Sequence, residues 1–77
     1  MPNNLPSLSP IQVVRAMKKA GFVELRQKGS HLVLYNSATN KRVTIPMHKG
    51  RDIKKPLLRK ILDMEAQMSV EEFLKLL

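Results

Sequence analysis

The chain is 77 residues long, which is the size of one small domain. Its 14 Lys and Arg residues outnumber 6 Asp and Glu residues, so the formal net charge is +8. Such a charge favours a polyanionic partner, either nucleic acid or an acidic protein surface. Because cysteine is absent, the sequence excludes disulfides, thiolate zinc sites and cysteine nucleophiles, and it favours the reducing cytoplasm. We expect no signal sequence and no membrane span, since no apolar run approaches ~18–20 residues.

The N-terminal part of the chain predicts a flexible arm followed by a helix. Residues 1–8 contain two prolines and two asparagines without periodicity, which is typical of such an arm. Ser9 is a suitable N-cap, with Pro10 at the first helical position and Gln12 placed to complete a capping box. The helix should stop at Gly21, which can adopt a left-handed conformation. Its expected apolar side consists of Ile11, Val14 and Met17.

Three antiparallel strands are expected next. Lys28-Gly29 predicts a two-residue turn, which pairs Leu25 with Leu32 and gathers most aliphatic side chains on one face. A polar turn leads to a third strand over residues 42–46. The expected pairs with that strand are Leu34 with Val43 and Leu32 with Ile45. The expected core face is Val23, Leu25, Leu32, Leu34, Val43 and Ile45. The expected open face is Phe22, Glu24, Arg26, His31, Val33, Tyr35, Arg42 and Thr44.

Two more helices are expected after a basic loop over residues 47–55. Pro56 can open the first of them, and its expected apolar stripe is Leu57, Leu58, Ile61 and Leu62. Ser69 and Glu72 form a second capping box, followed by the apolar residues Val70, Phe73, Leu74 and Leu77. Residues 9–77 therefore predict one α+β domain of order α-β-β-β-α-α, with helices on one face of a three-stranded antiparallel sheet.

The residues that could carry chemistry gather around His31. The expected register puts Arg26 directly opposite His31 on the open face and puts Pro46 on its other side, with His48 diagonal to it. The expected diagonal neighbours on the first hairpin are Glu24 and Lys28. No phosphate-binding loop or His-Glu-x-x-His motif is present, and with two histidines and no cysteine we expect neither a metal nor another cofactor.

An imidazole among cations suits RNA cleavage without a metal ion. The 2′-hydroxyl must lose a proton, the 5′-oxygen must gain one, and cations must stabilise the charge that develops on phosphorus. An imidazole can take or give a proton near neutral pH. A single histidine on an exposed strand is, however, more often an ordinary surface residue, so the spacing by itself leaves both interpretations open.

Three segments resemble the HicA-type mRNA interferase toxins. They are Arg-Gln-Lys-Gly-Ser-His at 26–31, Val-Thr-Ile-Pro at 43–46 followed by His48, and Leu-Leu-Arg-Lys-Ile-Leu at 57–62. The resemblance implies a double-stranded-RNA-binding-like fold and ribosome-independent mRNA cleavage by a histidine that matches His31. It also implies a HicB-type antitoxin that covers the face bearing this histidine, with a monomeric toxin that joins a larger complex. Leu32 departs from the family, because many relatives carry a second histidine there.

The expected site therefore combines one catalytic residue, His31, with a set of RNA-binding side chains. That set is Arg26, Lys28, Ser30, His48, Lys49, Arg51, Lys54 and Lys55. Two other functions remain open on the residues alone. One is a non-catalytic double-stranded RNA-binding module, and the other is an interaction module for an acidic protein.

Overall fold

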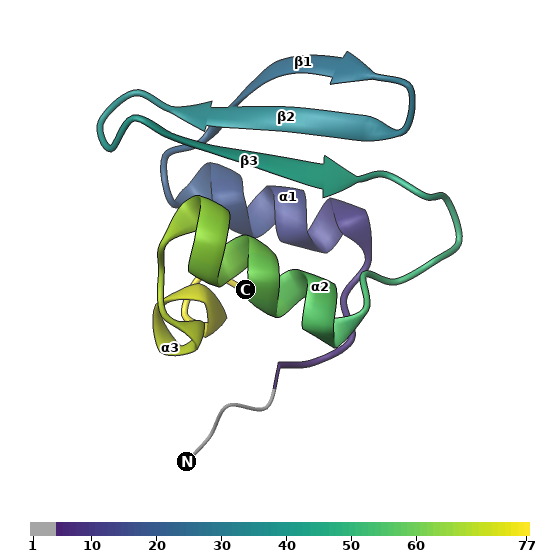
Figure 1. Cartoon of the computed structure of the whole chain (residues 1–77). Coiled ribbons are helices and arrows are strands. Elements are labelled where there is room, and N and C mark those ends of the chain that lie inside the picture. The colour runs from purple at the N-terminus through teal and green to yellow at the C-terminus, as the bar shows by residue number, and fades with distance from the viewer. Residues whose placement is uncertain (1–4) are drawn as a thin grey trace.

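The computed structural model describes residues 5–77 and confirms the expected fold class (Figure 1). A three-stranded antiparallel sheet of order β1-β2-β3 has the helices packed on one face, and its other face is open. The elements in chain order are α1 (Pro10–Lys19), β1 (Val23–Lys28), β2 (His31–Asn36), β3 (Lys41–Pro46), α2 (Lys55–Lys60), the π-helix η1 (Ile61–Ala66) and α3 (Val70–Leu74). No helix within residues 5–77 is long and apolar enough to cross a membrane.

The start of α1 follows the sequence prediction. The Ser9 hydroxyl accepts from the Gln12 amide at 3.2 Å, and the Ser9 amide donates to the Gln12 side chain at 2.9 Å, which is a complete capping box. The apolar side differs from the prediction at one residue, because Ile11 is 60% exposed while Val14 is buried. The buried row of the helix passes through Pro10, Val13, Val14 and Met17, and Ile11 lies beside this row.

The end of α1 explains why Phe22 is buried, although the sequence placed it on the open face. Gly21 adopts a φ of +106°, and the Phe22 amide donates to the Met17 carbonyl at 3.0 Å. The Gly21 amide donates to the Lys18 carbonyl at 3.0 Å, which completes a Schellman motif. Such a motif brings together the apolar side chains on either side of the turn, and Phe22 and Met17 are accordingly both buried.

The two strand pairs differ in how well the sequence predicted them. The β2–β3 register is confirmed, with Leu34 opposite Val43. The predicted β1–β2 register is wrong: the turn is formed by Gly29 and Ser30, one residue later than expected, so Lys28 pairs with His31 and the pairing next to the turn shifts by two residues. A II′ turn requires glycine at its first central position, and Gly29 holds that position with a φ of +61°.

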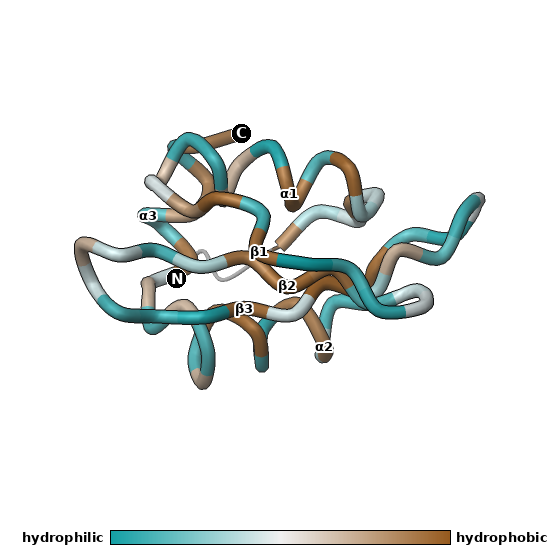
Figure 2. The backbone as a smooth tube through the Cα atoms, turned by 90° about the horizontal axis from the view of Figure 1, so that it is seen from above, coloured by the Kyte–Doolittle hydropathy of each residue, from teal (hydrophilic) through white to brown (hydrophobic). Residues whose placement is uncertain are grey.

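A β-bulge between Glu24 and Arg26 gives β1 a different role from the expected one. Val23 and Leu25 were expected in the core but are 60% and 46% exposed. The positions of β1 that share a face with the buried residues of β2 are occupied by Glu24 and Gln27. Most of β1 is accordingly hydrophilic in Figure 2, and this edge strand extends the sheet without covering the core.

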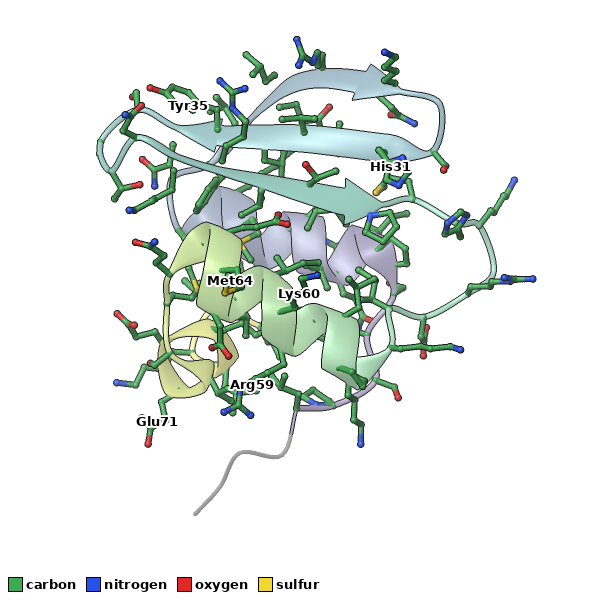
Figure 3. The ribbon with its side chains drawn as sticks, in the orientation of Figure 1. His31, Tyr35, Arg59, Lys60, Met64 and Glu71 are labelled. Carbon is green, nitrogen blue, oxygen red and sulfur yellow. The ribbon has the colours of Figure 1, made fainter. Side chains whose placement is uncertain are left out.

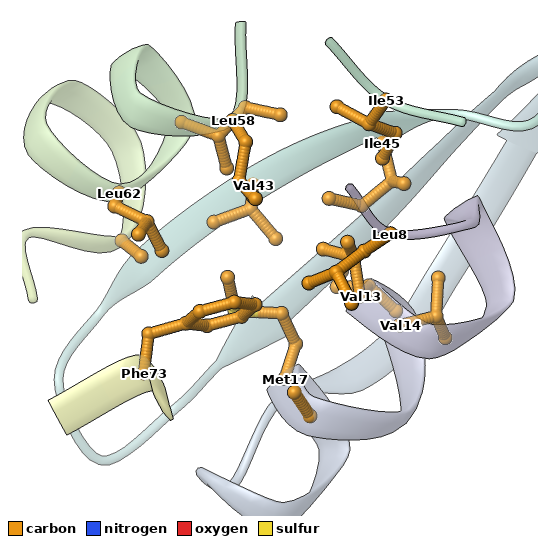
Figure 4. Close-up of a cluster of buried hydrophobic side chains, with 14 of the residues drawn as sticks. Leu8, Val13, Val14, Met17, Val43, Ile45, Ile53, Leu58, Leu62 and Phe73 are labelled. Atoms are coloured by element: carbon orange, nitrogen blue, oxygen red, sulfur yellow. The ribbon is translucent and has the colours of Figure 1, made fainter. Parts of the chain in front are cut away.

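The core lies between β2, β3 and the helices (Figure 4). Phe73 from α3, Leu62 from η1 and Met17 from α1 converge on the sheet residues Leu34 and Val43, all fully buried. The predicted stripe of α2 and η1 is buried at Leu58, Ile61 and Leu62. In the C-terminal helices, Leu57 and Leu77 were expected in the apolar stripes but are exposed.

Part of the expected arm belongs to this core. Leu5 and Leu8 are both buried, and the Ile53 amide donates to the Leu8 carbonyl at 2.8 Å. The arm predicted over residues 1–8 is therefore packed from Leu5 onward. For residues 1–4, which lie outside the described residues, the expectation stays a prediction.

The C-terminal helices close the outer edge of β3. Lys54 is the N-cap of α2, and Pro56 is its second residue rather than its first. The helix continues into η1, where the Glu65 carboxylate accepts from the Thr44 amide at 2.8 Å. This bond gives one amide of the edge strand β3 a partner outside the sheet.

The short helix α3 begins with the second predicted capping box. The Glu72 amide donates to the Ser69 hydroxyl at 3.0 Å, and the Ser69 amide donates to the Glu72 carboxylate at 2.8 Å. The hydrogen bond from the Ser69 amide holds the pKa of Glu72 below its usual value.

Candidate active site

His31 is the first residue of β2 and lies exposed on the open face (Figure 3). Its direct neighbours across the sheet are Lys28 on β1 and Pro46 on β3. Directly opposite residues in antiparallel strands project from the same face, with Cβ atoms roughly 4.5–5.5 Å apart. His31 and Lys28 therefore form a neighbouring imidazole–ammonium pair at the end of the sheet nearest the β1–β2 turn.

The corrected register changes which charges surround His31. Arg26, expected directly opposite, pairs with Val33 and is diagonal to His31, at ~7–8 Å. Glu24, expected as a diagonal neighbour, lies on the helix-covered face of the sheet instead. There its carboxylate binds the Lys18 ammonium at 2.6 Å. The surroundings of His31 on β1 are thus purely cationic.

A basic loop over residues 47–53 begins beside this pair. The Met47 amide donates to the Ser30 carbonyl, so the loop is tied to the residue that precedes His31. At its other end the loop is tied to Leu8 through the Ile53 amide. Figure 1 shows the loop beyond β3, at the same end of the sheet as the β1–β2 turn. It carries three exposed side chains from the expected RNA-binding set: His48, Lys49 and Arg51.

Lys54 and Lys55 are not brought onto the open face. They form the N-cap and first residue of α2, which belongs to the helical layer on the other side of the sheet (Figure 1). Both side chains are exposed. The structure therefore groups Arg26, Lys28 and the loop cations with His31, and it separates Lys54 and Lys55 from them. Ser30 contributes its backbone carbonyl to the loop anchor.

The other end of the open face has a different character. Tyr35 lies at the far end of β2 from His31 (Figure 3). The Arg42 guanidinium lies 5.9 Å from the Tyr35 ring centroid, within the range of a cation–π contact, and the Tyr35 hydroxyl donates to Asn40 at 2.9 Å. These contacts tie Tyr35 to Arg42 on β3 and to Asn40 in the β2–β3 turn.

One feature near His31 was missed by sequence reasoning. A groove of about 480 Å³ separates the start of α1 from the basic loop. Its lining includes Pro10 and Ile11 on the helix side and Met47 to Asp52 on the loop side. The sequence does contain one sign of this groove. The helical row of Pro10, Val13, Val14 and Met17 forms the buried stripe of α1 and leaves the apolar residue Ile11 outside it.

Metal-ligating side chains do not gather in the described part of the chain. Residues 5–77 contain no group of three or more His, Cys, Asp or Glu side chains that could hold a metal ion.

Comparison with known proteins identifies the family. The family model for the HicA toxin of bacterial toxin–antitoxin systems matches residues 12–67, which span α1 to the end of η1 and include His31, Lys28 and the basic loop. No curated protein matches the chain. A match over this much of a 77-residue chain confirms the resemblance carried by the three sequence segments. The chain is a member of the HicA toxin family of bacterial toxin–antitoxin systems.

Proposed function

We propose that this toxin is an endoribonuclease that cleaves mRNA in the cytoplasm without a metal ion, with His31 as its general acid–base residue. The observation that carries the proposal is the pairing of an exposed His31 with Lys28 on an open, cationic sheet face of a HicA-family chain. Proton transfer and phosphate binding both need such groups within one site.

The chemistry needs only groups that this end of the sheet supplies. The imidazole of His31 removes the proton of a ribose 2′-hydroxyl, and the 2′-oxygen attacks the adjacent phosphorus. The bond from phosphorus to the 5′-oxygen breaks, and this oxygen takes up the proton that His31 removed. The products are a 2′,3′-cyclic phosphate and a 5′-hydroxyl. Lys28, directly opposite, and Arg26, diagonal to His31, stabilise the negative charge of the transition state.

The remaining expected RNA-binding residues act on the phosphates beside the cleaved bond. His48, Lys49 and Arg51 project from the loop that is anchored to Ser30, so they hold the strand where it leaves the sheet. Lys54 and Lys55 lie at the start of α2 in the helical layer. They therefore bind phosphates of the RNA that are more distant from the cleaved bond. Such contacts give affinity without reading the base sequence.

The test uses a short RNA and the same RNA with one 2′-deoxy nucleotide at the cleaved position. Cleavage of the RNA should persist in EDTA, and the 2′-deoxy substrate should stay intact because the attacking hydroxyl is missing. Product ends are analysed for a 2′,3′-cyclic phosphate. Loss of cleavage in EDTA with recovery in magnesium contradicts the metal-independent mechanism. Binding without any cleavage points instead to a non-catalytic RNA-binding module.

We also propose that a HicB-type antitoxin covers the His31 face. Toxins of this family work in toxin–antitoxin pairs, and a net charge of +8 favours an acidic partner. The toxin alone is then a monomer, and the complex is larger. Phe22 is buried and does not contribute to this face, but Val23, which pairs with Tyr35 and is 60% exposed, adds apolar surface to it.

Raising the salt concentration should therefore slow association of toxin and antitoxin, mainly through the association rate constant. Lys28→Ala should lower that rate constant, whereas Lys75→Ala, which removes an exposed lysine next to α3, should change it little. Stopped-flow fluorescence over a range of salt concentrations measures both effects. An association rate that is independent of salt would rule out electrostatic steering.

A further inference from the structure

The groove between the start of α1 and the basic loop has the size of a small-ligand site. Its volume of about 480 Å³ lies within the range of roughly 300–1,000 Å³ that is typical of such sites. Both of its walls are held in place. The capping box of Ser9 and Gln12 fixes the helix start, and the loop is anchored at the Met47 amide and the Ile53 amide.

The walls combine an apolar floor with a cationic rim. Pro10, the 60%-exposed Ile11 and the half-buried Met47 provide apolar surface. The rim carries His48, Lys49 and Arg51, together with the carboxylate of Asp52. A nucleotide has the complementary chemistry, since its base presents a flat apolar face and polar edges, and its phosphate is anionic.

The loop wall of the groove begins next to the His31 site. Met47 lines the groove, and its amide binds the carbonyl of Ser30, the residue before His31. Met47 also directly follows Pro46, which lies opposite His31 across the sheet. A strand whose phosphate rests between His31 and Lys28 therefore reaches the groove with a neighbouring nucleotide.

We propose that this groove binds one unpaired base of the RNA, next to the phosphate that is cleaved. The proposal rests on the proposed endoribonuclease function and names its substrate as single-stranded at that position. Pro10, Ile11 and Met47 contact the face of the base, and Lys49 and Arg51 bind its phosphate. The Asp52 carboxylate accepts hydrogen bonds from amino or imino groups on the edge of the base. A base held in a duplex is not free to enter, so double-stranded RNA is a poorer substrate.

The experiment measures binding of labelled eight-nucleotide RNAs whose 2′-oxygens are methylated, so that they cannot be cleaved. In each RNA a different single nucleotide lacks its base. For the wild-type protein, one position should show about tenfold weaker binding on base removal, which corresponds to ~1.4 kcal/mol. Ile11→Ala should weaken binding of the complete RNA and remove the difference at that position. Met64→Ala is the matched control, because Met64 is an apolar side chain that is 69% exposed on η1.

Each outcome decides the proposal. Loss of the base effect in Ile11→Ala, with the effect kept in Met64→Ala, supports it. An unchanged base effect in Ile11→Ala overturns it. A change in sedimentation of Ile11→Ala without a change in the base effect also overturns it, and identifies the groove as a contact between two copies of the chain. These RNAs cannot be cleaved, so the binding experiment does not depend on catalysis. If the base effect is found but the protein cleaves no RNA, the groove still binds a base and only the proposed endoribonuclease activity is rejected.

Discussion

Replacing His31 by alanine should slow single-turnover cleavage of RNA by ~10²–10⁴-fold, the usual contribution of a placed acid–base group. The affinity for RNA should change little, because the substitution leaves every lysine and arginine of the site in place. His31 is exposed and directly follows the turn formed by Gly29 and Ser30, so its loss should also leave the fold intact. Rapid-quench cleavage with enzyme in excess, together with binding titrations on non-cleavable RNA, measures the two effects separately.

The surrounding cations provide the contrast. Lys49→Ala in the loop should weaken binding and lower the salt slope by ~0.7 for single-stranded RNA, with a smaller effect on the rate of the bound complex. Lys28→Ala should affect both quantities, since Lys28 is directly opposite His31. His48→Ala should behave like Lys49→Ala, because His48 lies in the loop rather than on the strand.

Cleavage by His31→Ala at the wild-type rate would remove His31 from the mechanism. His31 would then be an ordinary exposed strand residue. The cationic face would remain as a binding surface for RNA or for an acidic protein. A strong loss of single-turnover rate in His48→Ala would instead indicate that the two histidines share the proton transfers.

Leu34→Ala should lower the free energy of unfolding by ~2–5 kcal/mol. Leu34 lies on the central strand β2, is fully buried, and packs between the sheet and the helices. A loss of this size is a large part of the ~5–15 kcal/mol that a small domain has in total. Urea denaturation followed by circular dichroism measures it.

Leu25→Ala is the matched control for this prediction. It is the same substitution in the same sheet, but Leu25 is 46% exposed at the bulge of β1. We expect a change within ~0.5 kcal/mol, as for most surface substitutions. The comparison also separates the two possible hairpin registers, because the register expected from the sequence places both leucines in the core. Equal losses for the two variants would contradict the bulged register.

Local sequence signals determined the helix starts and the β2–β3 pair. Ser9 with Gln12, and Ser69 with Glu72, form their capping boxes from residues three positions apart, so no distant part of the chain is needed. The β2–β3 register follows from alternation on two strands joined by a short turn. The three segments that resemble the HicA toxins are also short and local in the chain, and the family match confirmed the family that they indicated.

The partners of His31 were decided by the tertiary structure. Lys28-Gly29 and Gly29-Ser30 are both acceptable two-residue turns in the sequence, and the shift between them exchanges Arg26 for Lys28 opposite His31. The observed register comes with a bulge in β1 that places Glu24 on the helix-covered face, where it contacts Lys18 on α1. The sequence pattern does not show that the helices leave the edge strand β1 uncovered. Val23 and Leu25 therefore looked like core residues.

The sequence by itself determined the fold class, the family, the position of the candidate histidine and the basic character of its surroundings, because these depend on composition, periodicity and short-range hydrogen bonds. Only the tertiary structure decided which side chains share its face. The arm packs Leu8 against Ile53, and this contact holds the basic loop beside the exposed Ile11 to form the groove. It also leaves Lys54 and Lys55 in the helical layer. These arrangements depend on contacts between residues far apart in the chain, and such contacts leave no periodic trace in the sequence.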